Sequence, residues 1–173
     1  MDLKITTLEN NHDKKSFTCG YSMLDNYIQR QAKQDIKRDL SACFVLEYEQ
    51  SHLVLGYYTL SANSINRGEF PISISKKLPQ SYQDLPTILL GRLAIDEKFK
   101  GKGFGELILL DALNRCVEIS KNLGTLAVVV DPIDSKAEKF YSKYGFILIP
   151  GTGKMFIPIK TIEDLIQKES VTS

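Results

Sequence analysis

A stretch of three glycines and two lysines, at residues 100–105, is the part of the sequence best suited to holding an anion. The residues before it have the character of a strand and those after it recur at helical spacing, so the glycines should lead a strand into a helix. Glycines let backbone N–H groups converge, and a helix N-terminus adds partial positive charge, so the stretch can hold a phosphate group. A tight turn with incidental lysines is the alternative. The residues are Lys100, Gly101, Lys102, Gly103, Phe104 and Gly105.

A second group of suitable residues lies on one side of a predicted helix. This helix begins near Ser22, whose spacing to Asp25 has the form of a capping box, and apolar residues recur along its inner side. The other side carries a basic stripe that can contact nucleic acid phosphates. A solvated charged face gives the same pattern. The stripe consists of Arg30, Lys33, Lys37 and Arg38.

The remaining sequence supplies the elements that must position these residues. Alternating and β-branched stretches predict strands, helical spacing predicts helices, and Asp134 is placed to cap one of the helices. The order β, α, ββ, β, α, β, α, ββ predicts an α/β (α+β mixed) domain with a mixed sheet covered by helices. The predicted strands are 3–7, 42–48, 53–62, 88–96, 125–130, 146–149 and 155–159. The predicted helices begin near residue 22, after the glycines at 101–105 with an end near residue 123, at residue 135 and near residue 161, and a loop is predicted at 63–86.

Length and composition favour a single globular domain over residues 1–173. Lysine and arginine number 22 against 21 acidic residues, so no global field draws the chain to nucleic acid or membrane. The three cysteines have no CxxC spacing, which favours a reducing compartment and argues against a zinc site. With no signal peptide and no apolar stretch of roughly 20 residues, we expect a cytoplasmic protein without a metal or a membrane span.

The glycine stretch resembles the acetyl-CoA signature of the GNAT N-acetyltransferase superfamily, Arg/Gln-x-x-Gly-x-Gly/Ala. Lys100, Gly103 and Gly105 fall on its positions, with lysine in place of the usual first residue. The resemblance implies that residues 100–105 hold the pyrophosphate of acetyl-CoA. It also implies a GNAT fold, with a mostly antiparallel sheet splayed at the strand whose main chain holds the pantetheine arm. That strand contains Leu93, Ala94 and Ile95.

A second motif agrees with the first. The residues from Asp134 to Phe146 look like the superfamily pattern Asn-x-x-Ala-x-x-Phe-Tyr-x-x-x-Gly-Phe, with aspartate replacing the asparagine that contacts CoA. The resemblance makes Tyr141 the acid for the departing CoA thiolate. A phenol of pKa about 10 is only modestly weaker than a thiol near 8.5. A core tyrosine beside Phe140 is the alternative.

No protein base stands out for the attacking amine. His12 and His52 lie in polar, loop-like segments, where a histidine is commonly a solvated surface residue, so neither is assigned a role. An α-amine titrates at about 7.7 to 8.0, so much of it is already neutral near pH 7. The chemistry therefore fits an α-amine better than a lysine ε-amine.

A closer resemblance covers about residues 17–162. Segments at 17–20, 57–61, 90–94, 109–113 and 128–131 are similar to the TacT-like GNAT toxins of type II toxin–antitoxin modules. The resemblance implies acetylation of the α-amino group of aminoacyl-tRNA, a block of translation, a ribbon-helix-helix antitoxin and a homodimer. The basic stripe and Arg92 would then contact tRNA, although Arg92 also suits a structural ion pair. A GNAT enzyme for a small amine or a protein N-terminus, or a CoA-binding or partner-binding module without turnover, are the alternatives.

Overall fold

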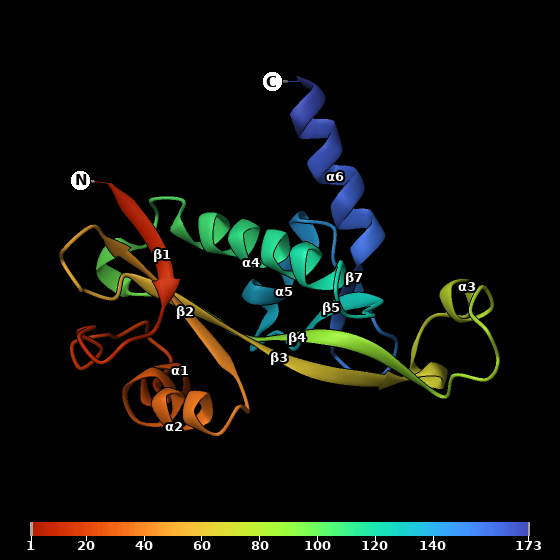
Figure 1. Cartoon of the computed structure of the whole chain (residues 1–173), viewed down its shortest axis with the longest axis horizontal. Helices are drawn as coiled ribbons and strands as arrows, with labels where there is room; N and C mark the ends of the chain where they lie inside the picture. The colour runs from red at the N-terminus through yellow and green to blue at the C-terminus, as the bar shows by residue number, and fades with distance from the viewer. Residues whose placement is uncertain (1, 173) are drawn as a thin grey trace. The chain divides into compact units, whose positions relative to one another are not determined.

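The computed structural model describes residues 2–172, and its strands form one hydrogen-bonded series (Figure 1). Seven strands in these residues follow the order β1-β2-β3-β4-β5-β7-β6. Strands β1, β2 and β3 pair antiparallel, as do β5, β7 and β6, whereas β4 and β5 pair in parallel. This confirms the mixed, mostly antiparallel sheet. The strands are β1 Leu3–Thr7, β2 Ala42–Tyr48, β3 Gly56–Asn66, β4 Asp84–Ile95, β5 Ala127–Val130, β6 Ile147–Leu148 and β7 Met155–Pro158.

The helices agree with the predicted ones in number and order, apart from one additional short helix. The helix predicted from Ser22 contains a π-helical turn, in which the Ala32 N–H donates to the Tyr27 carbonyl, five residues earlier. The helices are α1 Ser22–Asn26, the π-helical turn Tyr27–Gln31, α2 Ala32–Lys37, α3 Ile72–Ser75, α4 Phe104–Ser120, α5 Ser135–Lys143 and α6 Ile159–Thr172, with 3₁₀ turns at Arg67–Glu69 and Glu97–Phe99.

The loop predicted at residues 63–86 is more ordered than expected. β3 and β4 both extend into it, and α3 lies between them. The Arg67 guanidinium donates to the carbonyls of Ser75, Pro79 and Tyr82, so one side chain satisfies three backbone acceptors of the connection. These contacts join residues distant in sequence, which local periodicity does not reveal.

The chain divides into two compact units. Unit 1 comprises residues 1–61 and 90–112, and unit 2 comprises residues 62–89 and 113–173. The chain passes from one unit to the other within β3, within β4 and within α4. A single domain over residues 1–173 stays a prediction.

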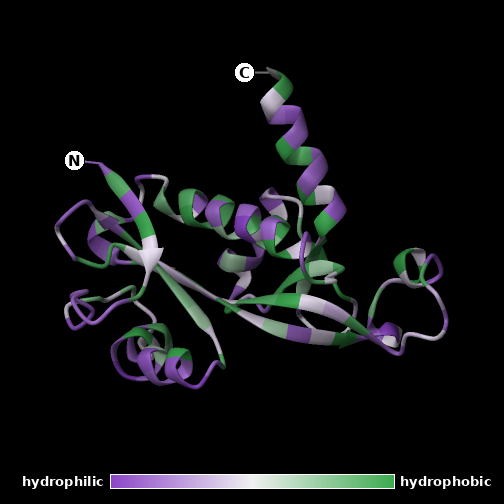
Figure 2. Cartoon of the chain, viewed as in Figure 1, coloured by the Kyte–Doolittle hydropathy of each residue, from purple (hydrophilic) through white to green (hydrophobic). Residues whose placement is uncertain are grey.

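In unit 1, α1, the π-helical turn and α2 pack their apolar side against β2, β3 and β4. The inner residues Leu24, Tyr27, Ile28 and Ala32 are buried together with Tyr57, as their spacing predicts. The outer side of α1 and α2 is hydrophilic (Figure 2). Ser22 and Asp25 do not form the predicted capping box: the helix is capped at Tyr21 without a side-chain bond, and Asp25 instead accepts from the Cys19 N–H.

In unit 2, a second core surrounds β5 and β7. All four residues of β5 are buried, as the apolar run predicts, and Phe70 meets Phe156 edge to face with ring centroids 5.2 Å apart. Ile159 and Ile162 anchor the start of α6. Within residues 2–172, no helix combines the length and the apolar character that crossing a membrane requires.

The buried side of α4 differs from the predicted one. Leu107 and Leu110 are 39% and 38% exposed, although both were expected to face inward with Leu113 and Val117. The residues buried along this helix are Phe104, Ile108, Leu109, Ala112, Leu113, Cys116 and Val117. Because residues 107–110 are all apolar, periodicity in this turn does not identify which of them face the core.

Candidate active site

The glycine stretch in unit 1, residues 100–105, has the geometry of an anion-binding site. Gly101 and Gly103 have φ of +79° and +80°, a conformation that favours glycine. A Cβ atom added at either position would have no atom within 4 Å, so the backbone here is open to a ligand. The Leu107 N–H donates to the Gly103 carbonyl, and the three preceding N–H groups have no acceptor within α4. These features favour the phosphate seat over an incidental turn.

Lys100 turns toward the N-terminal part of unit 1. Its Nζ lies 2.6 Å from the Cys19 carbonyl oxygen, to which it donates, and 5.8 Å from the centroid of the Tyr21 ring. One of its three N–H groups is therefore used within the protein. Lys102 is exposed, and Phe104 is buried where α4 begins.

Asp96, which directly follows β4, joins the same N-terminal segment to the residues that lead into the glycines. It is 4% exposed, and its two carboxylate oxygens accept from the backbone N–H groups of Lys98 and Thr18, each at 3.0 Å. The Glu97 N–H donates in turn to the Thr18 carbonyl at 2.8 Å. Segment Thr18–Gly20 is thus fastened to residues 96–100. Sequence reasoning missed this role, because 78 residues separate Thr18 from Asp96.

The predicted pantetheine strand offers its main chain rather than its side chains. Ala94 and Ile95 are buried, at 6% and 9% exposure, and Leu93 is half-buried. In the described residues, β4 pairs with β5 only over Thr87–Leu89 and continues beyond these pairs to Ile95. The main chain of residues 93–95 lies past that parallel pairing.

Tyr141 lies on α5 in unit 2. Its ring meets those of Phe140 and Phe146 edge to face, at centroid distances of 5.3 and 5.2 Å, and the residue is 7% exposed. Burial raises the pKa of Tyr141 well above the ordinary value of a phenol. Among residues 2–172, its hydroxyl forms no hydrogen bond. The hydroxyl oxygen is not among the buried side-chain atoms that lack a partner, so it reaches the surface of the unit and can donate a hydrogen bond to a ligand there.

Asp134 caps α5. Its Oδ1 accepts from the Ala137 N–H at 2.8 Å, which confirms the predicted cap. One oxygen thus positions the helix that carries Tyr141. A contact from Asp134 to CoA stays a prediction.

The five residues predicted to contact tRNA have different surroundings. The four cations of the helical stripe, Arg30, Lys33, Lys37 and Arg38, are exposed. Arg92 is half-buried, and its guanidinium carbon lies 3.5 Å from the centroid of the Tyr27 ring. The structure therefore gives Arg92 a packing role in unit 1 through a cation–π contact.

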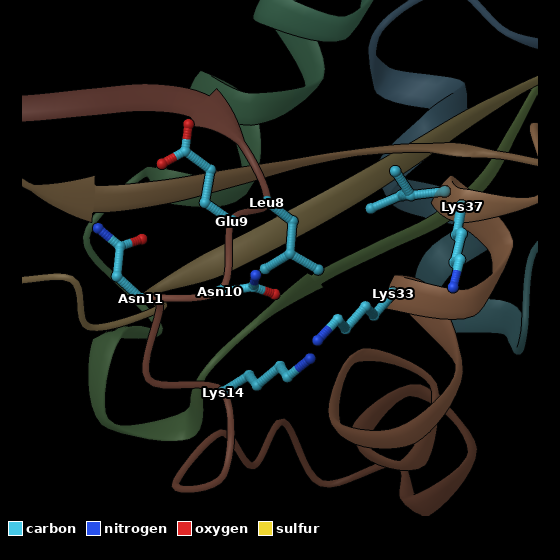
Figure 3. Close-up of a pocket in the computed structure, with 8 residues that line it drawn as sticks. Leu8, Glu9, Asn10, Asn11, Lys14, Lys33 and Lys37 are labelled. Atoms are coloured by element: carbon cyan, nitrogen blue, oxygen red, sulfur yellow. The ribbon is translucent and has the colours of Figure 1, made fainter.

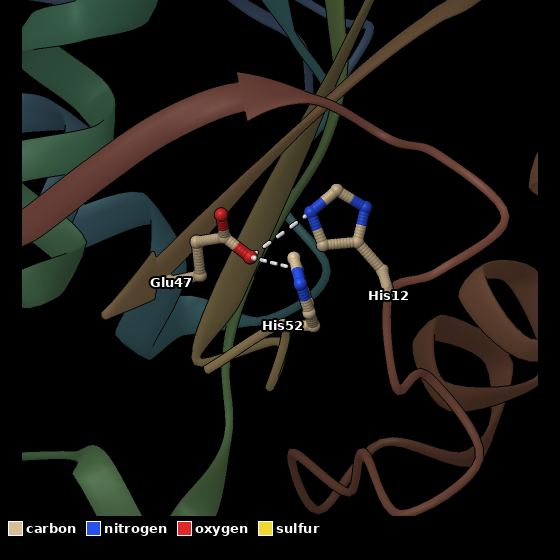
Figure 4. Close-up of side chains that lie close together, drawn as sticks. All are labelled: His12, Glu47 and His52. Carbon is tan, nitrogen blue, oxygen red and sulfur yellow. Dashed lines mark ion pairs between the residues drawn. The ribbon is translucent and has the colours of Figure 1, made fainter. Parts of the chain in front are cut away.

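Both histidines approach one buried carboxylate (Figure 4). Glu47 Oε2 lies 3.1 Å from His12 Nε2 and 3.7 Å from His52 Nδ1, although no described residue donates a well-directed hydrogen bond to it. His12 is 6% exposed, so the expectation of a surface residue is wrong for it. The reason is Glu47, a buried acid on the neighbouring strand. His12 Nδ1 accepts from the Glu9 N–H, which places the ring proton on Nε2 and hinders metal binding there.

The three cysteines are buried and are not activated. Burial raises the pKa of the thiols of Cys43 and Cys116 to about 12. Burial and the hydrogen bond to Asp25 raise the pKa of Cys19 to about 11. All three thiols are protonated near neutral pH, so none is a nucleophile for an acetyl group.

Sequence comparisons identify the relatives. Residues 80–155 match the family model described as an acetyltransferase (GNAT) domain. The chain is 33% identical over 138 residues to a tRNA-acetylating toxin of Mycobacterium tuberculosis, covering 80% of each chain. It is 28% identical over 165 residues to a probable toxin TacT of Sinorhizobium fredii, covering 91% of each.

Solved structures of similar fold are also toxins of this kind. AtaT complexed with acetyl-methionyl-tRNAfMet has a TM-score of 0.88 and 31% identity, over 95% of this chain and 99% of that one. A KacT mutant with one tyrosine replaced by phenylalanine has a TM-score of 0.88 and 30% identity, over 95% and 99%. A similar tyrosine mutant of AtaT, bound to acetyl-CoA and the C-terminus of its antitoxin AtaR, has a TM-score of 0.80 and 27% identity, over 96% and 99%. The chain therefore belongs to the GNAT acetyltransferase family, in the group that includes the toxins TacT, KacT and AtaT.

Proposed function

We propose that this protein transfers the acetyl group of acetyl-CoA to the α-amino group of an aminoacyl-tRNA and thereby blocks translation. The observation that carries this proposal is the similarity to AtaT, solved with acetyl-methionyl-tRNAfMet, over 95% of this chain. The tRNA-acetylating toxin of M. tuberculosis supports it. The reaction needs a seat for acetyl-CoA, a neutral amine and a donor for the departing thiolate.

The open glycine backbone would hold the pyrophosphate. The N–H groups of the first turn of α4 and the left-handed Gly101 and Gly103 can donate to its oxygens. Lys102 adds charge at the rim, and Lys100 has N–H groups left after its bond to Cys19. The main chain of residues 93–95 would pair with the pantetheine arm, and Asp134 is a further candidate contact.

Tyr141 would assist the departure of CoA. Because burial raises the pKa of Tyr141 still further above that of a free thiol, complete proton transfer to the thiolate is uphill. Donation of a strong hydrogen bond to the developing thiolate charge is the role that fits this phenol. KacT and AtaT have each been solved as a mutant in which one tyrosine is replaced by phenylalanine, which supports testing a tyrosine for a functional role in this chain as well.

The acceptor amine would attack the thioester directly. The thiols in unit 1 and unit 2 are protonated and do not offer an acyl-cysteine route. An α-amine of pKa about 8 is substantially neutral near pH 7, so the reaction does not need a strong protein base.

The partners would be tRNA and an antitoxin. The exposed cations Arg30, Lys33, Lys37 and Arg38 are suited to tRNA phosphates, whereas Arg92 would act through its packing on Tyr27. AtaT bound to the C-terminus of AtaR and the KacTA–DNA complex support an antitoxin partner. We propose a ribbon-helix-helix antitoxin, a homodimer and a cytoplasmic location, as the resemblance to the toxins implies.

The test is transfer of radiolabelled acetyl from acetyl-CoA to charged tRNA, with deacylated tRNA as the blank. We expect label only in the charged pool and a fall of at least a hundredfold in rate for Tyr141→Phe. Tyr144→Phe, at the end of the same helix, is the matched control and should remain active. Absence of label in every charged tRNA, with acetyl-CoA still bound, would overturn the proposed substrate.

A further inference from the structure

Unit 1 contains a positively charged groove that local sequence patterns do not predict. Its volume is about 630 Å³, and it lies between the segment that follows β1 and helix α2. Lys14 and Lys33 extend toward each other from these two elements, with Lys37 beside them (Figure 3). The groove is lined by Leu8, Glu9, Asn10, Asn11, Lys14, Lys33, Ile36 and Lys37.

The lysines of this groove have no anionic partner among the residues that the structure describes. Among residues 2–172, none of the three ammonium groups forms an ion pair or a hydrogen bond. Glu9 is the one acid in the lining, against three lysines. Like charges gathered in a concave surface strengthen the local field and attract a counter-ion. The groove is therefore suited to a ligand that carries several negative charges.

We propose that this groove binds consecutive phosphates of the tRNA backbone. The inference rests on the proposed function and narrows its RNA contacts to Lys14, Lys33 and Lys37. Lysine contacts phosphate as a point charge without requiring one geometry, and the amides of Asn10 and Asn11 can donate to phosphate or ribose oxygens. Arg30 and Arg38 of the stripe do not line the groove, so they contribute less.

An RNA backbone suits this groove better than an acidic peptide does. Among the described residues that line it, Leu8 and Ile36 are the two aliphatic ones and none is aromatic. Peptide recognition usually depends on buried apolar or aromatic anchors. A groove of lysines and asparagines instead supplies charge and amide donors, which match repeated phosphates.

The experiment measures binding of fluorescein-labelled total tRNA by anisotropy at several salt concentrations. Each phosphate contact contributes about 0.7 to 0.9 to the slope of log K against log salt, or about fivefold in affinity at 0.1 M. Lys14→Gln, Lys33→Gln and Lys37→Gln should each weaken binding about fivefold, and the triple variant about a hundredfold. Lys15→Gln is the matched control, since Lys15 is exposed and adjacent but does not line the groove.

The experiment distinguishes an error in the groove proposal from an error in the proposed function. If the wild-type protein acetylates charged tRNA but Lys14→Gln binds it with unchanged affinity and salt slope, the groove proposal alone is wrong. It is also wrong if Lys15→Gln weakens binding as much as Lys14→Gln does. Lysine-dependent binding of poly-glutamate with lysine-independent binding of tRNA would assign the groove to an acidic peptide instead. If the wild-type protein acetylates no charged tRNA, the proposed function is wrong.

Discussion

Replacing Asp96 with asparagine should loosen the loop that leads into the glycines. Both Asp96 oxygens accept backbone N–H groups, from Thr18 and from Lys98. An asparagine keeps one accepting oxygen, and its NH2 group then faces the other N–H donor. The side chain keeps its size, so the perturbation is confined to hydrogen bonding.

The expected cost follows from these contacts. One bond to a charged acceptor is lost and one N–H group is left unpaired in a largely buried place, which together amount to about 3 kcal/mol. For a chain of this size, that corresponds to a fall in Tm of roughly 6 to 12 °C. Because residues 96–100 lead directly into Gly101, the affinity for acetyl-CoA should fall at least threefold.

Two measurements separate the effect of Asp96→Asn on stability from its effect on acetyl-CoA binding. Thermal unfolding gives the change in Tm, and calorimetric titration with acetyl-CoA gives Kd without depending on any acceptor. Asp84→Asn is the matched control, since Asp84 begins the strand that Asp96 follows but is exposed, and its effect should stay within about 0.5 kcal/mol. Unchanged Tm and Kd in Asp96→Asn would refute the reasoning. A lower Tm with unchanged Kd would mean that Asp96 supports the fold but not the acetyl-CoA seat.

Three further predictions follow from the site. Gly103→Ala should weaken acetyl-CoA binding, since it costs about 1 to 2 kcal/mol at positive φ and fills the open seat; equal weakening by Gly124→Ala, in titrations of both, would contradict this. Because burial raises the pKa of Tyr141 in the folded protein, the protonated phenol contributes stability that is fully present below about pH 10 and is lost as the pH rises further. Denaturant titrations should show that the free energy of unfolding falls more steeply above about pH 10 in the wild type than in Tyr141→Phe. Equal slopes of stability against pH in the two proteins would speak against this. Zinc or a chelator should leave Tm unchanged; a rise with zinc that His12→Gln abolishes would show that the cluster takes a metal.

Local elements of this fold could be predicted from the sequence, but contacts between distant segments could not. The four apolar residues of β5 and the Asp134 cap are decided by near neighbours, so pattern and capping chemistry suffice for both. The burial of His12 depends on Glu47, and the groove depends on Lys14 meeting α2; neither pair lies close in sequence. Such contacts depend on how the chain folds back.

In the candidate site, too, the residues that belong to a local motif could be predicted, and those that depend on distant contacts could not. The glycines and Tyr141 could be selected because each belongs to a motif with fixed spacing. Asp96 belongs to no motif, and its partner Thr18 lies at the other end of unit 1 in sequence. Arg92 was expected at an RNA surface or in an ion pair, but an aromatic face can also hold a guanidinium, and Tyr27 does so here.

The π-helical turn at Tyr27–Gln31 makes the charged surface depend on the number of residues as well as on their types. A hydrogen bond that reaches back five residues accommodates one residue more than an α-helical turn does. A helical wheel drawn at constant spacing therefore aligns Arg30 with Lys33 and Lys37, whereas only the two lysines line the groove. Deleting one residue from this turn would restore α-helical spacing and leave both lysines of α2 facing Lys14, because the turn is where the extra residue is held. A relative with one residue fewer here would thus form the same surface from cations whose spacing in the sequence differs.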